Sequence, residues 1–79
     1  MQRWEYTFVS CSFNKDTGFW HPSFVNEHKV QNWRQGMTIE QYSNHLGKEG
    51  WELVNLMVTA PGEKGKGEGY RLVFKRPAA

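Results

Sequence analysis

The side chains of this chain best suited to chemistry are one cysteine and three histidines. Cys11 would form a thiol–imidazole pair if a hairpin placed it against His21 or His28, and such a pair activates a thiol as a nucleophile. A cysteine within an apolar strand more often packs as a small hydrophobic side chain. We favour that second interpretation for Cys11.

His45 and Glu49 lie four residues apart, so one helix would place them side by side. They could share a metal ion or a proton, but a catalytic metal site needs about three protein ligands, and no third ligand is identifiable. The spacing favours a solvated helix contact. No nucleophile–base set or carboxylate pair can be assembled elsewhere. We therefore predict no metal, no cofactor and no enzymatic activity.

Glycines recur in the segment from 60 to 69, at Gly62, Gly65, Gly67 and Gly69. Phosphate-binding loops need G-x-x-x-x-G-K-S/T, or G-x-G-x-x-G between a strand and a helix, and neither pattern is present. The segment leads into a strand, so no helix N-terminus would face a bound anion. We predict a hairpin loop here.

Basic and aromatic residues offer a second set of ligand or partner candidates. The combination of cations with aromatic rings is typical of surfaces that bind single-stranded nucleic acid. The formal charge is only +2 and the sequence pI about 8.9, and charged side chains also protect exposed strand edges, which is the interpretation we favour. The candidates are Trp20, Trp33, Lys64, Lys66 and Arg71.

The first half of the chain must position these residues on strands. Residues 4–13 alternate with a period of two and are rich in aromatic and β-branched types, which predicts a strand. Turn residues fill 14–18, and 19–25 is apolar again, so a hairpin partner is expected. Pro22 restricts that partner to an edge strand or an irregular loop. The polar segment 26–36 is predicted to be a connecting loop.

The second half predicts one helix and two strands. Thr38 and Gln41 fit a capping box, so a helix begins at Ile39 and runs to about Glu49. Gly47 is expected to let this helix approach a sheet closely, and Gly50 to end it. Residues 51–59 and 70–75 then form strands, the second with Tyr70, Leu72 and Phe74 facing inward.

The expected architecture is an α+β fold in which a small β-α-β-β sheet carries one helix on one face, with an optional extra edge strand from 19–25. Trp4 and Trp51 are expected to close the core beneath the helix. The other sheet face is also apolar, and one short helix cannot cover both faces, so we predict a homo-oligomer formed through the second face. The alternative is that the 19–33 insert, with Phe19, Trp20, Phe24 and Trp33, folds back over that face within the same chain. The interface candidates are Val9, Cys11, Phe13, Val54, Leu56 and Val58, with Val73 beside them.

The chain has 79 residues, which allows one domain, 1–79. A domain of this size gains little stability from its own core, and its single cysteine provides no intramolecular disulfide, so association would help to stabilise it. No apolar run resembles a signal peptide or approaches the roughly 18 residues of a membrane span. We expect a cytoplasmic protein without membrane contact.

Three blocks of sequence resemble the bacterial family called domain of unknown function 4177. They are Trp4-Glu5-Tyr6, the stretch 46–54 that reads Leu-Gly-Lys-Glu-Gly-Trp-Glu-Leu-Val, and the stretch 73–77 that reads Val-Phe-Lys-Arg-Pro. The resemblance implies a β-α-β-β domain of bacterial or phage origin with no assigned activity. The segment from about 14 to 37 is longer than the family's usual connection between the first strand and the helix.

Together these observations predict a small accessory or interaction module that self-associates through its second sheet face and binds an unknown protein partner. The alternative is a weak nucleic-acid-binding protein that uses the basic final hairpin and the aromatic residues of the 14–37 insert.

Overall fold

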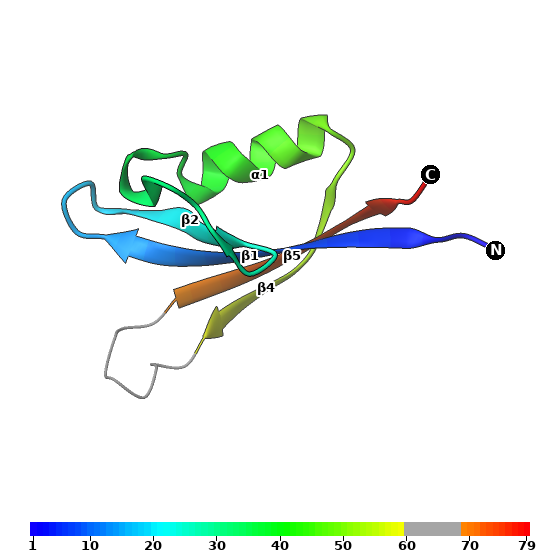
Figure 1. The fold of residues 1–79 in the computed structure, drawn as a ribbon, viewed down its shortest axis with the longest axis horizontal. Helices are drawn as coiled ribbons and strands as arrows, with labels where there is room; N and C mark the ends of the chain where they lie inside the picture. The colour runs from blue at the N-terminus through cyan, green and yellow to red at the C-terminus, as the bar shows by residue number, and fades with distance from the viewer. Residues whose placement is uncertain (60–68) are drawn as a thin grey trace.

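A computed structural model describes residues 1–59 and 69–79. In these residues a five-stranded sheet carries one α-helix (Figure 1), so the predicted α+β class is confirmed. The strand order is β3-β2-β1-β5-β4, and every pairing is antiparallel. The elements are β1 (Trp4–Asn14), β2 (Phe19–Val25), β3 (His28–Lys29), the 3-10 helix η1 (Trp33–Gln35), α1 (Ile39–Lys48), β4 (Glu52–Thr59) and β5 (Gly69–Pro77).

The insert between the first strand and the helix adds two strands to the predicted β-α-β-β order. β2 pairs along β1, whereas β3 pairs only with Phe24 and Val25. On the outer side of β2, no strand of the described residues therefore pairs with Pro22. This position suits proline, which has no backbone N–H to donate to a neighbouring strand. The β1–β2 register shifts beside Pro22, and Ser23 is the extra residue. Its hydroxyl bonds the Ser10 carbonyl at 3.2 Å.

The helix begins and ends as the sequence predicts. The Thr38 side chain accepts from the Gln41 backbone N–H, and the Gln41 side chain accepts from the Thr38 N–H, which confirms the capping box. At the other end the N–H groups of Gly50 and Trp51 donate to the carbonyls of Gly47 and Leu46, at 3.1 and 3.0 Å. This is a Schellman motif, and Gly50 supplies its left-handed residue with φ +90°.

Gly47, unlike Gly50, is not required by the local backbone or packing. A Cβ built at this position would meet no atom within 4 Å, so the expectation that Gly47 permits close approach to the sheet is wrong.

The core lies between α1 and the sheet. Leu72 and Phe74 face the helix as predicted, and Tyr70 and Trp51 pack against the core. The buried hydrophobic residues of the described chain are Val9, Cys11, Leu46, Leu72 and Phe74.

The predicted faces of β1 are reversed in the structure. Val9 is opposite Leu72 in the register, and Val9 and Cys11 are buried beneath α1 rather than on the far face. Trp4, expected beneath the helix, is exposed on the opposite side. The physical reason is that small side chains in the middle of β1 leave room for the helix, whereas a row of large rings there would hold it away.

A bulge in β4 changes the faces of that strand as well. The β4–β5 register shifts between Leu53 and Asn55, so Val54 is the extra residue. Leu56 and Val58 are opposite Leu72 and Tyr70 and share the helix side with Leu53, whereas Met57 is opposite Arg71 on the other side. The prediction that Leu56 and Val58 lie on the second sheet face is therefore wrong.

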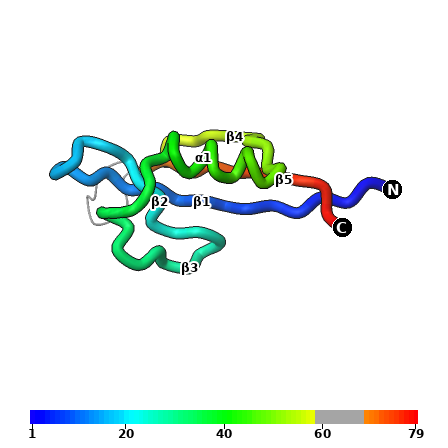
Figure 2. The backbone as a smooth tube through the Cα atoms, turned by 90° about the horizontal axis from the view of Figure 1, so that it is seen from above, coloured from blue at the N-terminus to red at the C-terminus, as the bar shows by residue number. Residues whose placement is uncertain are grey.

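Strand β4 begins beside the end of α1 and runs away from it (Figure 1), while β3 lies at the opposite edge of the sheet (Figure 2). The two chain termini lie at the same end of the molecule in both views. The predicted loop from 60 to 69 lies outside the described residues except for Gly69, which begins β5. Within the described residues no helix has the length and apolar character that crossing a membrane requires.

Candidate interaction surface

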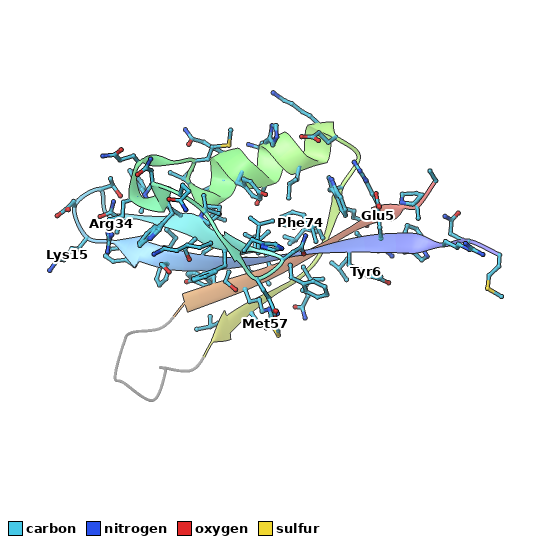
Figure 3. All side chains as sticks on the ribbon, in the orientation of Figure 1. Glu5, Tyr6, Lys15, Arg34, Met57 and Phe74 are labelled. Atoms are coloured by element: carbon cyan, nitrogen blue, oxygen red, sulfur yellow. The ribbon has the colours of Figure 1, made fainter. Side chains whose placement is uncertain are left out.

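The sheet surface opposite α1 carries large side chains that solvent reaches. Trp4, Tyr6 and Phe8 alternate with the inward residues of β1 and are 42%, 50% and 41% exposed. Tyr6 and Met57 point away from α1 in Figure 3, whereas Phe74 lies between the sheet and the helix. We call this surface the open face, and its members are Trp4, Tyr6, Phe8, Phe24, Met57, Arg71, Val73 and Lys75.

Two cations of β5 lie over aromatic rings of β1 on the open face. The Lys75 ammonium is 4.2 Å from the centre of the Trp4 ring, and the Arg71 guanidinium is 5.7 Å from the centre of the Phe8 ring. Both distances are within the range of cation–π attraction. Glu52 of β4 is opposite Lys75 in the register. The open face therefore combines a ring surface with a slight excess of positive charge.

The rings of Tyr6 and Phe8 stand next to each other, with centres 6.5 Å apart and planes inclined by 25°. They are two residues apart on one strand, which places them on the same face at a fixed spacing. A strand holds such rings at little entropic cost because each has only two rotatable bonds. Together they form a pair of adjacent rings on the open face.

A second cluster, on the helix side, joins three elements at the end of the molecule where the termini lie. The Arg76 guanidinium forms an ion pair with Glu5, donates to the Glu49 carbonyl at 3.1 Å and lies 4.3 Å from the centre of the Trp51 ring. These contacts connect β5 to β1 and to the end of α1. The cluster orients the Schellman turn and leaves no free cation for a ligand at this position.

His21 belongs to a buried polar cluster beneath η1. Its Nδ1 lies 3.2 and 3.1 Å from the carbonyls of Gly36 and Met37, so this nitrogen carries a hydrogen, because carbonyls only accept. Its Nε2 lies 3.0 Å from the Thr17 hydroxyl. Asn14 donates to the Arg34 carbonyl nearby, at 3.0 Å. These bonds hold the segment from 34 to 37 against β2.

The thiol–imidazole pair considered from the sequence does not form. Cys11 is opposite Pro22 and faces the core, whereas His21 is opposite Ser12 and faces the other side of the sheet. Burial raises the pKa of the Cys11 thiol from 9.0 to about 12, which disfavours the thiolate. His28 lies on β3, at the sheet edge beyond β2.

His45 and Glu49 do meet, with Nε2 and Oε1 2.7 Å apart, and both side chains are half exposed. This is the predicted helix contact. Among residues 1–59 and 69–79, no three side chains of His, Cys, Asp or Glu are grouped to hold a metal ion. Burial, and then the Glu49 carboxylate, raise the pKa of the neighbouring Tyr42.

The two insert tryptophans do not form one surface. Trp20 packs edge-on against Tyr70 at 4.6 Å and lies 5.3 Å from the Phe13 ring. Trp33 instead lies under the Arg34 guanidinium, 4.7 Å away, and borders a polar hollow of about 360 Å³ formed by residues 29–35. Trp20 shares a face with Phe13, whereas Trp33 contacts His21, whose side chain points to the opposite face.

Of the ligand or partner candidates from the sequence, Arg71 lies on the open face, while Lys64 and Lys66 are outside the described residues. Leu56 and Val58 are exposed at the β4 edge, and Val54 is exposed at its bulge. Phe13 is exposed but lies in the Trp20 cluster. Sequence reasoning missed Trp4, Tyr6 and Phe8 as surface candidates, because the alternation along β1 does not tell which of its two sides the helix covers.

The model of one protein family, described as "Domain of unknown function (DUF4177)", matches residues 4–77 of the chain. The match spans all five strands and the helix, so the chain belongs to this family. Searches of the curated proteins and of the solved structures returned no match.

Proposed function

We propose that this member of the DUF4177 family is a small, non-enzymatic interaction module that self-associates through its open face. The observation that carries the proposal is the exposed row Trp4, Tyr6 and Phe8, which lies on the same sheet face as His21 but beyond the part that η1 covers. Contiguous apolar surface of this kind marks an interaction site, and aromatic residues are enriched at the centres of interfaces.

The small core supports the same proposal. Five hydrophobic residues of the described chain are buried, whereas large apolar side chains on the other face remain in contact with water. Burial of apolar area contributes about 25 cal/mol per Å², so covering the open face would add stability that the monomer lacks. A second copy is the partner always present at matching concentration, and its own open face is equally apolar.

The test replaces Tyr6 and Phe8 together by threonine, which retains a strand-forming residue but removes both rings. We expect the double variant to raise the dissociation constant of the oligomer at least about 100-fold, since central aromatic side chains commonly contribute 2 kcal/mol or more each. Light scattering coupled to size-exclusion chromatography measures the mass, and circular dichroism verifies the fold.

Phe13→Thr is the matched control, because Phe13 is an exposed aromatic residue of the same strand, β1, on the helix side of the sheet. It should leave the mass unchanged. An unchanged mass for the double variant would overturn the proposal.

A second candidate function is supported by the two cation–ring contacts. Lys75 and Arg71 lie over Trp4 and Phe8, and aromatic rings with adjacent cations can stack bases and neutralise phosphates of a single strand. The combined variant Arg71→Gln/Lys75→Gln separates the two functions. It would abolish binding of a labelled single-stranded oligonucleotide at low salt, while it keeps the Tyr6 and Phe8 rings on which the proposed self-association depends. No binding by the unmodified protein at micromolar concentration would exclude this candidate.

A further inference from the structure

Strand β4 forms one edge of the sheet, and its exposed side chains set it apart from the other edge. It pairs with β5 on one side, and no strand of the described residues pairs with its outer side. The opposite edge ends in β3, a strand of only two residues. β4 is eight residues long. An unpaired strand of this length offers a row of backbone donors and acceptors to another strand.

The usual protections of a sheet edge are missing from the second half of β4. Residues 55–59 contain no proline and no charge, and the bulge at Val54 lies before them. The large apolar side chains of β4 are 43–56% exposed. They are Leu53, Val54, Leu56, Met57 and Val58. Short uncharged segments with this composition are prone to pair with further strands.

We propose that β4 pairs antiparallel with β4 of a second copy about a two-fold axis at Met57, so that two sheets join into one continuous sheet. A two-fold axis brings the same surface of both copies together, so the segment must complement itself. With the axis at Met57, Leu56 of each copy is opposite Val58 of the other. Both side chains lie on the helix side, where directly opposite residues pack against each other.

Other registers fit this segment less well. An axis at Leu56 would place Asn55 opposite Met57 and bring the bulged Val54 into the ladder. The axis at Met57 keeps the bulge outside the central pairs. The single charge of β4, Glu52, lies five residues from Met57. Its two copies would be about 33 Å apart, so no like charges meet.

The partner is a second copy of the chain, because each β4 edge presents the same apolar side chains to the other. Leu56 and Val58 remain exposed on the helix side, since β4 runs away from α1 (Figure 1), and a second β4 brings the same two side chains to cover them. This edge shares only Met57 with the open face, and the proposal stands without association through that face.

A disulfide tests the register directly. Opposite residues of antiparallel strands have Cα atoms about 4.5–5.5 Å apart, within the roughly 4.4–6.8 Å that a disulfide spans. In a Cys11→Ala background, Met57→Cys should form a covalent dimer under mild oxidation at least about tenfold faster than Lys15→Cys, which lies on the distant β1–β2 turn. Equal rates for the two variants would overturn the proposal.

Leu56→Lys supplies a second test without a cysteine. Two lysines at the joined edge would be near each other and near Val58, so we expect the edge dimer to weaken about 100-fold. Leu56 is on the helix side, so this variant spares the open face.

The Tyr6→Thr/Phe8→Thr variant distinguishes the two surfaces. Retained Met57→Cys crosslinking in this background would support the edge pairing even if open-face association failed. Loss of the crosslink there, with the fold intact, would count against an independent edge contact, as would an unchanged mass for Leu56→Lys.

Discussion

The alternation of single residues along β1 decides which chemistry the molecule shows to solvent. Val9 and Cys11 lie in the core, whereas Tyr6 and Phe8, which alternate with them along the strand, lie on the open face. A one-residue change of register would exchange these two sets, so the register shown by Val9 opposite Leu72 defines the exposed surface. The same alternation places the thiol of Cys11 away from water and from every histidine it could have paired with.

Burial of Cys11 makes the stability of the fold depend on alkaline pH. The folded pKa is about 12 and the ordinary value is 9.0, so above pH 9 the unfolded chain loses this proton first. The free energy of unfolding should then fall as pH rises from 9 towards 12, by at most about 1.4 kcal/mol per pH unit for one proton. Tyr42, whose pKa is also raised, adds loss in the same direction.

Urea unfolding at several pH values between 8 and 11 measures this slope, and Cys11→Ala should reduce it. A slope equal in Cys11→Ala and the unmodified protein would contradict the assignment of the effect to the thiol.

At the scale of elements, the helix end provides a matched pair of glycines. Gly50 has φ +90°, whereas Gly47 lies within α1 with free space around a potential Cβ. We expect Gly50→Ala to reduce the free energy of unfolding by about 1 kcal/mol, because alanine is strained in the left-handed region. Gly47→Ala should increase it by about 0.5–1 kcal/mol through helix propensity.

Thermal and urea unfolding of the two variants, measured side by side, check these opposite signs. A destabilising Gly47→Ala would show that the helix needs a glycine there for a reason the structure does not contain.

Most elements could be predicted from the sequence because their signals are local. The capping residues Thr38 and Gln41, the left-handed Gly50 and the period of two in residues 4–13 act within a few positions, and each of these elements lies within about one residue of its predicted place. The strand at 19–25 also formed where the turn chemistry indicated.

The faces could not be predicted in the same way. A period of two identifies two sets of side chains but does not state which set meets the helix, and the answer for β1 depended on its pairing with β5. In β4 the single bulged residue Val54 moved Leu56 and Val58 to the side of Leu53. Bulges leave no clear local signal, so the sequence alone assigned Leu56 and Val58 to the wrong side of β4.

At the scale of the whole molecule, a single layer of helix covers one face of a five-stranded sheet. The described residues leave the open face and the β4 edge available, and the two surfaces lie on different parts of the sheet. Two independent two-fold contacts of this kind, one face to face and one edge to edge, can generate a closed tetramer. We therefore expect association in even-numbered steps that separate variants can remove one at a time.

Sedimentation equilibrium of the unmodified protein over a hundredfold range of concentration tests whether the chain self-associates. The chain mass is 9.3 kDa. Self-association predicts a weight-average mass that rises with concentration to at least twice this value. A single species at the chain mass across the whole range would contradict it.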